Sequence, residues 1–258
     1  MRTIAVANQK GGSAKTTTAV NLAAALAGLG RRVLLVDLDG QCSASKWFGI
    51  PNSNDDDGLF SVFNGEQGLV QTITETGTPG VDVVPASPRL FDIEKVMASE
   101  MLPQMTLTEQ FKGLPEDWDV ILLDCPPQLG LLTVNALVAA NEVLIPVEIS
   151  VMALDGLVQL LSTIEKLRAK LNEDLVVNGI LPCRVDRRTN IASQAIDNLR
   201  EQFDGLVLET VIRENVRFKE APRFSEPILT YAPSSHGAAD YRALAEEILQ
   251  RHQQEVSQ

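Results

Sequence analysis

Short apolar runs rich in β-branched residues recur along the chain and are separated by longer segments. The runs lack the alternation of polar and apolar residues that marks a strand with one solvated face. They therefore predict strands that are covered on both faces. The predicted strands are residues 4–7, 33–36, 81–84, 120–123, 143–147, 176–181 and 207–211.

Several of the intervening segments have apolar residues at the three- and four-residue spacing of amphipathic helices. The predicted helices are residues 16–29, 131–139, 154–171, 191–203 and 237–254. Alternating strands and helices predict an α/β fold, a doubly wound, mostly parallel β-sheet flanked by helices. Residues 52–78 are polar and glycine-rich, and they predict a helix-containing surface insertion.

The composition agrees with this fold and indicates the size of its core. The chain has 258 residues, of which 45% are hydrophobic, which is enough for a substantial core. No run approaches the roughly 20 apolar residues of a transmembrane helix. No repeat or proline-rich linker divides the chain, so we expect a single domain over residues 1–258. Three cysteines without metal-like spacing, and a first strand that begins almost at once, predict a cytoplasmic protein without a signal peptide.

The segment QKGGSAKTTT, residues 9–18, follows the first predicted strand and precedes the first predicted helix. Strand, glycine-rich loop, lysine, hydroxyl and helix is the order of a phosphate-binding loop. Glycines let backbone N–H groups converge on a phosphate, and the positive end of the helix favours the same anion. Lys15 adds a positive charge, and the Thr16 hydroxyl is a candidate Mg²⁺ ligand.

The loop departs from the general pattern G-x-x-x-x-G-K-[ST] at both glycines, where Gln9 and Ala14 stand. It fits instead a deviant version, K-G-G-x-x-K-T, with an additional lysine, Lys10, at its start. If the backbone at Ala14 needs a positive φ, alanine is strained there.

Carboxylates stand at the ends of two predicted strands. Asp37 and Asp39 follow the second strand, and Asp124 ends the strand 120–123. In doubly wound sheets, ligands bind at the carboxyl ends of the strands. Asp124 therefore matches the Walker B role beside Mg²⁺. Of the other two, one is a candidate for holding Mg²⁺-bound water and the other for orienting the attacking water.

Together these motifs resemble the ParA/Soj-type partition ATPases of the deviant Walker A (ParA/MinD) family, a P-loop NTPase-like group. The resemblance includes VLLVDLDGQ, DVILLDCPP, NALVAANEVLIPVE, GILPCRVDRRTN and VIRENVRFKEAPRFSEPI, in that order. The chain departs from the family pattern at Ala14 and Cys42, where glycine is usual, and at Gly40, where proline is usual. We expect it to lack the N-terminal helix-turn-helix extension found in larger plasmid members.

The resemblance implies an ATPase that binds ATP and Mg²⁺ and forms a homodimer around two nucleotides. The implied nucleotide-binding residues are Lys10, Gly11, Gly12, Ser13, Ala14, Lys15, Thr16 and Thr17. Lys10 would reach the partner's phosphates and act in catalysis with Lys15 and Asp39, where Asp39 orients or activates water. Thr16, Asp37 and Asp124 would lie at the metal. Hydrolysis would be weak until an adaptor of the ParB type stimulates it.

The net charge of −12 means that contact with nucleic acid needs a local basic patch. Residues 180–223 carry eight basic and seven acidic residues, so the rest of the chain carries the net negative charge. Soj-like proteins bind DNA non-specifically as ATP dimers through this region, which implies a nucleoid-associated protein. The candidate DNA-binding residues are Arg200, Arg213, Arg217, Lys219 and Arg223.

Three alternatives stay open at this point. A positioner of a non-DNA cargo, such as a protein microcompartment or a chemotaxis cluster, would have the same fold. A MinD-like regulator that cycles on membranes needs a basic amphipathic C-terminal helix, whereas this tail is acidic, so we expect no membrane partner. A metallo-reductase like the nitrogenase iron protein needs converging thiolates, which Cys42 and Cys125 are not spaced to provide. Residues 187–190 would border either the adenine pocket or the dimer face.

Overall fold

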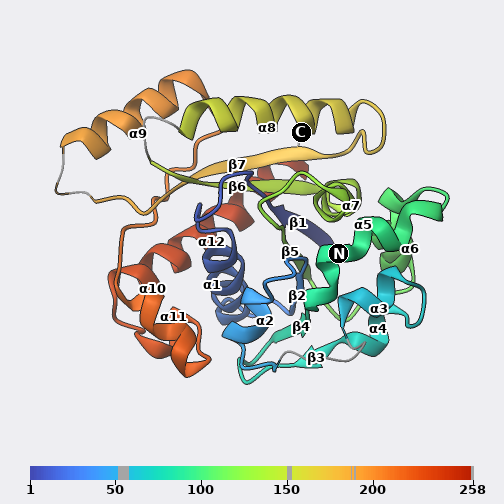
Figure 1. Ribbon diagram of the computed structural model, residues 1–258. Helices are drawn as coiled ribbons and strands as arrows, with labels where there is room; N and C mark the ends of the chain where they lie inside the picture. The colour runs from blue at the N-terminus through green and yellow to red at the C-terminus, as the bar shows by residue number, and fades with distance from the viewer. Residues whose placement is uncertain (52–57, 150–152, 187, 189, 257–258) are drawn as a thin grey trace.

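A seven-stranded sheet runs through the part of the chain that the computed structural model describes, which is residues 1–51, 58–149, 153–186, 188 and 190–256 (Figure 1). Its strand order is β3-β4-β2-β5-β1-β6-β7. The strands are β1 (Arg2–Val6), β2 (Val33–Asp37), β3 (Thr74–Glu75), β4 (Val81–Val84), β5 (Val120–Asp124), β6 (Glu142–Glu148) and β7 (Val176–Cys183).

The sheet is parallel except at one edge, where β3 pairs antiparallel with β4. The predicted α/β fold class is therefore confirmed. Six of the seven predicted strands are present, because strands buried on both faces are continuous apolar runs that a sequence pattern reveals directly. The short edge strand β3 was not predicted.

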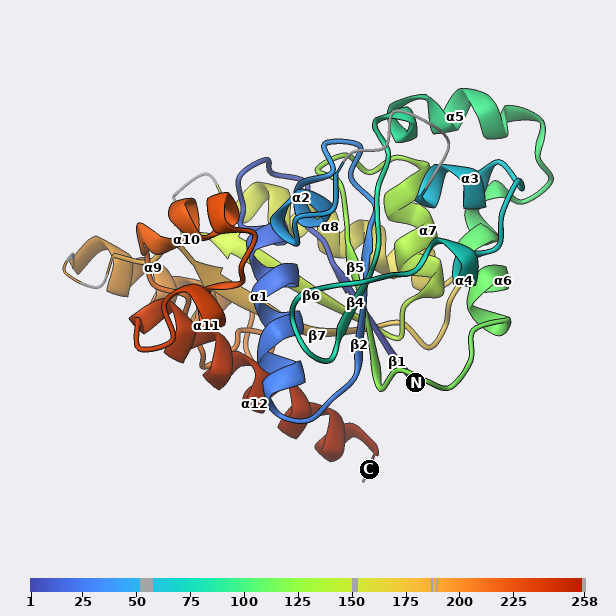
Figure 2. The same cartoon turned by 90° about the horizontal axis from the view of Figure 1, so that it is seen from below.

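Helices cover both faces of the sheet, as Figure 2 shows. The α-helices are α1 (Lys15–Gly28), α2 (Ser43–Trp47), α3 (Leu59–Phe63), α4 (Leu69–Thr72), α5 (Ile93–Val96), α6 (Thr106–Lys112), α7 (Leu131–Ala139), α8 (Ala153–Arg168), α9 (Asn190–Gln202), α10 (Arg217–Glu220), α11 (Ile228–Tyr231) and α12 (His236–Val256). The 3₁₀ helices are η1 (Pro88–Asp92), η2 (Met97–Ser99), η3 (Pro103–Met105) and η4 (Ala221–Phe224). All five predicted helices are confirmed.

Successive residues of β1 point to opposite faces and so belong to different halves of the core. Ile4 and Val6 pack with α1 and α12, whereas Ala5 packs with α7 and α8. Among the described residues, the most extensive contact between two helices joins α1 and α12, and it holds α12 against the helix that follows the phosphate-binding loop. This arrangement fixes the start of α1 at the carboxyl ends of the strands.

The prediction of a surface insertion over residues 52–78 is wrong in one respect. The segment does contain helices, α3 and α4, although residues 52–57 lie outside the described residues. However, α3 is buried throughout, and Leu59, Phe60 and Phe63 are part of the core beneath the sheet. The apolar residues of α3 follow a polar stretch closely, and this polar composition hid the buried helix.

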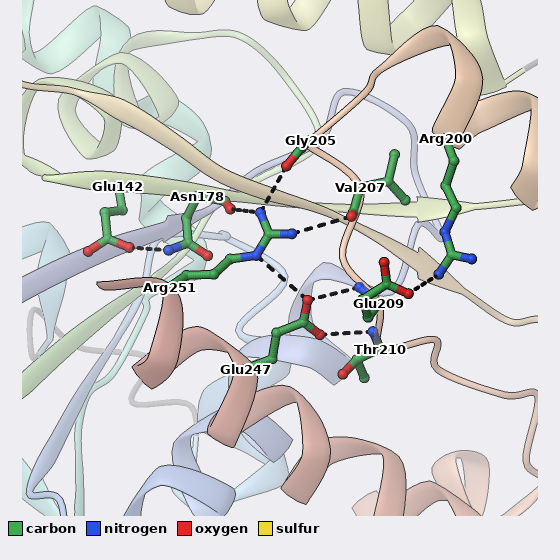
Figure 3. Close-up of polar contacts among 9 residues, drawn as sticks. All are labelled: Glu142, Asn178, Arg200, Gly205, Val207, Glu209, Thr210, Glu247 and Arg251. Atoms are coloured by element: carbon green, nitrogen blue, oxygen red, sulfur yellow. Dashed lines mark hydrogen bonds and ion pairs between the residues drawn. The ribbon is translucent and has the colours of Figure 1, made fainter. Parts of the chain in front are cut away.

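The predicted strand at residues 207–211 is also wrong. Among the described residues, one isolated bridge joins this segment to β7, between Ile180 and Val207, and another follows it between Val185 and Arg213. The N–H groups of Leu208 and Ile212 donate to carbonyl groups of β7, but side chains of α12 bind backbone groups of residues 205, 207, 209 and 210, as Figure 3 shows. Glu247 accepts hydrogen bonds of 2.8 Å from the N–H groups of Glu209 and Thr210, and Arg251 donates to the carbonyl groups of Gly205 and Val207.

Among the described residues, no helix combines the length and the apolar character needed to cross a membrane.

Candidate nucleotide-binding site

Three adjacent strands end together at the site. Val6 of β1 is in register with Asp124 of β5, and Asp124 is in register with Asp37 of β2. The phosphate-binding loop leaves β1 at this edge and enters α1 at Lys15. The fold therefore brings the loop and two strand-end carboxylates together at the position where doubly wound sheets bind ligands.

The loop is open toward the cavity in front of it. A Cβ atom added at Gly11 or Gly12 would meet no atom within 4 Å. The N-cap residue of α1, Ala14, makes no side-chain capping bond, so the first N–H groups of the helix are available to an anion. The Ser13 hydroxyl is buried and has no hydrogen-bond partner among the described residues.

At two of the three departures from the family pattern, the backbone conformation shows why the family has glycine at that position. Ala14 and Cys42 stand where the resemblance expects glycine, and their φ angles are 71° and 55°. Both therefore adopt the left-handed conformation that favours glycine. At the third departure, Gly40, the ring of Phe91 lies 3.1 Å from the position that a Cβ atom would occupy.

We expect Ala14→Gly to raise the free energy of unfolding by about 1 kcal/mol, because glycine adopts a positive φ without the steric cost that alanine has. Ala24→Gly, within α1, is the matched control and should lower it by about 1 kcal/mol. Urea denaturation of both variants measures the difference. If Ala14→Gly is less stable than the unaltered protein, the positive φ of Ala14 does not strain the folded state.

The side chains of the two loop lysines, Lys15 and Lys10, point in different directions. Lys15 is 7% exposed, and its Nζ donates a 3.3 Å hydrogen bond to the Lys10 carbonyl oxygen. Burial lowers the pKa of Lys15, and the charges of Asp124, Cys125 and Asp39 partly offset this effect. The Lys10 side chain is 44% exposed, and its Nζ lies 3.4 Å from Glu148 Oε2. Lys15 is therefore directed into the loop, whereas Lys10 lies at its outer rim.

Asp124 is a fully buried carboxylate without an ordinary hydrogen bond to either oxygen among the described residues. Burial raises its pKa well above the usual value, and the charge of Asp37 raises it further. Thr16 and Lys15 offset part of this shift. A buried carboxylate that lacks an ordinary hydrogen bond and lies beside the Thr16 hydroxyl is a strong candidate for a metal site.

Asp37 is also fully buried, but its oxygens have partners. The N–H and hydroxyl of Ser45 donate to Oδ2 at 2.8 and 2.7 Å, and the Asp39 N–H donates to Oδ1 at 3.2 Å. Burial raises the pKa of Asp37 to about 6. Asp37 thus ties α2 and the loop after β2 to the site, while Asp39 is partly exposed and lines the cavity.

We expect Asp124→Asn to stabilise the nucleotide-free protein by roughly 1–3 kcal/mol at pH 7. The raised pKa means that the folded state keeps a proton that the unfolded chain loses near its ordinary pKa of 3.8. Stability therefore falls as pH rises from that value toward the folded-state pKa, and the amide removes this fall. Denaturation between pH 4 and 8 measures it. If stability depends on pH in the same way in Asp124→Asn and in the unaltered protein, the pKa of Asp124 is not raised in the folded state.

A cavity of about 1060 Å³ lies in front of the loop. It is lined by Gly11, Gly12, Ser13, Ala14, Lys15, Thr16, Thr17, Asp39, Pro127, Arg184, Val185, Asp186, Arg188, Ile212, Arg213, Glu214, Asn215, Val216, Phe218, Lys219, His236 and Tyr241. All the predicted nucleotide-binding residues except Lys10 line this cavity. Of the residues predicted at the metal, Thr16 lines it, whereas Asp37 and Asp124 do not. Arg188 borders it, and Arg187 and Thr189 lie outside the described residues.

The candidate DNA-binding residues are divided between ion pairs and the cavity. Arg200 pairs with Glu209 and Arg217 with Glu220, at 2.8 and 2.7 Å. Arg213 is bound to the buried carboxylate of Asp240, and both Arg213 and Lys219 line the cavity. Arg223 is exposed on η4. Arg217, Lys219 and Arg223 thus lie within one short segment, apart from Arg200 on α9.

Sequence reasoning assigned no role in the cavity to Arg184, Asn215 or Phe218. Arg184 follows β7 directly, so the strand-end rule that identified Asp124 also identifies this residue. Asn215 and Phe218 follow no strand. Their position depends on the packing of α10 against the rest of the fold, and no local pattern signals it.

Comparisons with known proteins agree with this geometry. A family model described as an AAA domain matches residues 1–177. The chain is 40% identical over 245 residues to the sporulation initiation inhibitor protein Soj of Bacillus subtilis, covering 95% of this chain and 97% of that protein. It is 44% identical over 256 residues to the chromosome-partitioning ATPase Soj of Thermus thermophilus, covering 98% of each. The chain belongs to the Soj/ParA family of P-loop ATPases.

Solved structures extend this family assignment to the fold. A Mycobacterium smegmatis protein named cobyrinic acid a,c-diamide synthase, with bound ADP and magnesium, superimposes with a TM-score of 0.87 at 32% identity. The match covers 98% of this chain and 96% of that one. The cell division ATPase MinD of Pyrococcus furiosus gives a TM-score of 0.79 at 28% identity, covering 96% and 98%.

The residues of this Soj/ParA-family site fit magnesium and a nucleotide. Both Asp124 oxygens and the Ser13 hydroxyl are buried without ordinary partners among the described residues, as expected for groups that meet a metal or a phosphate. The open space beside Gly11 and Gly12 leaves their backbone accessible to phosphate oxygens.

Proposed function

We propose that this chain is a single-domain, ATP-dependent dimerising partition ATPase. In its ATP state it binds DNA non-specifically, and it segregates chromosome or plasmid DNA together with a ParB-type adaptor. The adaptor stimulates an ATPase that is weak alone, and the protein acts on the nucleoid in the cytoplasm. Nearly full-length similarity to proteins named for chromosome partitioning supports this proposal.

The observation that carries the proposal is the contrast between the two loop lysines. Lys15 is buried and can serve only the nucleotide of its own subunit. The half-exposed side chain of Lys10 can reach a second subunit that docks over the cavity. A cation that arrives only on docking would make hydrolysis conditional on the dimer, since it stabilises charge that develops in phosphoryl transfer.

The other site residues have complementary roles in this proposal. Backbone N–H groups of residues 11–16 and the Lys15 ammonium bind the phosphates. Thr16 and Asp124 hold Mg²⁺, Asp37 orders the loop at the metal, and Thr17 contacts the α-phosphate. When bound, Mg²⁺ neutralises phosphate charge. Asp39, which is partly exposed at the cavity, orients the attacking water.

DNA contact in this proposal uses Arg200, Arg217, Lys219 and Arg223, while Arg213 contributes less because it is bound to Asp240. In Figure 1 both helices that carry these residues lie along the left margin of the molecule, α9 above and α10 below. Non-specific contacts to phosphate would position the protein without reading sequence.

Sedimentation with duplex DNA tests the proposal. We expect the unaltered protein to co-sediment with ATP but not with ADP, and Lys10→Ala to lose at least tenfold in affinity in ATP because it removes a charge that joins the subunits. The control is Lys95→Ala, which removes an exposed lysine of α5 that pairs with Asp92. Binding that ignores the nucleotide would refute the switch, and ATP-dependent dimers without DNA affinity would favour a non-DNA cargo.

A further inference from the structure

Glu148 lies between two cations at the rim of the phosphate-binding loop. Its Oε2 is 3.4 Å from Lys10 Nζ, and its Oε1 is 3.3 Å from Arg184 Nη1. The same Arg184 nitrogen donates a 3.5 Å hydrogen bond to the Gly12 carbonyl oxygen. One carboxylate therefore joins Lys10 to an arginine that itself contacts the loop.

The ends of two neighbouring strands create this arrangement. Glu148 is the last residue of β6, in register with Cys183 of β7, and Arg184 comes next with a left-handed φ of 56°. The backbone of Lys10 is held nearby, since its N–H donates to Asn8 Oδ1 and the Asn8 amide donates to the Pro146 carbonyl oxygen. Lys10 is thus tied to β6 through both its backbone and its side chain.

The ion pair has a consequence for a lysine that acts in another subunit. While the subunit is separate, Lys10 is paired within its own chain, and it must leave Glu148 before it can reach a partner's phosphate. We propose that Glu148 is a positioning residue that holds Lys10 in the separate subunit, and that Arg184 sets how readily Lys10 is released. This inference rests on the proposed function, in which Lys10 acts across the dimer.

Neutralising Arg184 and neutralising Glu148 should have opposite effects on the release of Lys10. When Lys10 leaves, Glu148 keeps its bond to Arg184, so the carboxylate is not left without a cation. If Arg184 is neutral, Lys10 is the cation that remains beside Glu148 among the described residues, and Glu148 holds it more strongly. If Glu148 is neutral, Lys10 has lost the carboxylate that retains it.

The expected size of the effect follows from exposure. The side chains of Lys10, Glu148 and Arg184 are 44%, 29% and 42% exposed, so water screens their attraction. Pairs of this kind contribute modestly, and a symmetric dimer releases two of them. We therefore expect Glu148→Gln to tighten the dimer by about three- to tenfold and Arg184→Gln to weaken it by a similar factor.

Analytical ultracentrifugation with a saturating non-hydrolysable ATP analogue and Mg²⁺ measures the dimer dissociation constant. Nucleotide affinity is measured separately for each variant, because Arg184 lines the cavity. The double variant Glu148→Gln, Arg184→Gln completes a cycle, in which the Arg184 effect should disappear once Glu148 is neutral. Glu109→Gln removes a remote exposed carboxylate paired with Lys112 and is the control for charge alone.

The outcomes separate the two proposals. If the unaltered protein stays monomeric at saturating analogue, the proposed function is overturned. If it dimerises but Glu148→Gln matches Glu109→Gln or weakens the dimer, the role of Glu148 is overturned. A weakening by Arg184→Gln that persists in the double variant would overturn the coupling between the two residues.

Labelling of the nucleotide-free protein gives a readout that needs no dimer. Limited acetylation followed by mass spectrometry reports the reactivity of the Lys10 amine relative to Lys112. We expect Glu148→Gln to increase Lys10 labelling severalfold and Arg184→Gln to decrease it, and both effects should shrink at high salt. Equal Lys10 labelling in all variants would overturn the retention of Lys10 by Glu148.

Discussion

Replacing Glu142 by alanine should lower the free energy of unfolding by about 3–5 kcal/mol, one of the largest single losses that the structure predicts. Glu142 is the first residue of β6 and accepts hydrogen bonds from the Arg2 guanidinium. It also accepts one from Asn178 Nδ2, as Figure 3 shows. The side chains of Arg2 and Glu142 are only 7% and 3% exposed. Alanine would leave a buried guanidinium without its carboxylate. Chemical denaturation checks the value, and the melting temperature should fall by roughly 10 °C.

Two controls separate burial from charge. Glu209→Ala breaks an ion pair with Arg200 in which Glu209 is 82% exposed, and it should cost less than about 1 kcal/mol. The combined change Arg2→Met, Glu142→Leu removes both charges and should recover much of the stability, since a buried pair often contributes no more than apolar packing. A Glu142→Ala protein as stable as Glu209→Ala would show that the pair is not effectively buried.

Replacing Lys15 by alanine should weaken Mg·ATP binding by about 100-fold or more, because it removes a charge-assisted hydrogen bond to the phosphates. The Lys15 ammonium is buried in the loop, and its charge acts on Asp124. Without it, the nucleotide phosphates would lose a positive charge that also offsets the negative charges of Asp124 and Asp39 nearby. Isothermal titration calorimetry measures the affinity.

Lys112→Ala provides the control for this change, since it removes an exposed lysine of α6 far from the loop in sequence. It should leave the affinity for Mg·ATP unchanged. Circular dichroism establishes that the Lys15→Ala protein is folded before its affinity is compared. An affinity within twofold of the unaltered protein would mean that Lys15 does not meet the phosphates.

Much of the fold and the phosphate-binding loop could be predicted because the relevant signals are local. The strands of a sheet covered on both faces are unbroken apolar runs, and the loop is a short pattern between a strand and a helix. The prediction that Ala14 would be strained also depends on a single backbone position, and its φ of 71° agrees.

The errors concern groups whose partners lie far away in the sequence. The run at 207–211 has the composition of a strand, but Glu247 and Arg251 of α12 bind its backbone groups. The DNA contact of Arg213 stays a prediction, but the ion pair that holds its guanidinium to Asp240, 27 residues later, could not be foreseen. No local pattern contains such pairings, because they form only when α12 packs on the sheet.

The dependence of residues 205–210 on α12 also has a consequence for biosynthesis. This segment lies along the outer margin of β7, which would otherwise present unpaired backbone groups. Since the side chains that secure it belong to α12, this edge stays exposed until residues 247–251 have been synthesised. A chain truncated before residue 247 should therefore aggregate even though its phosphate-binding loop is intact.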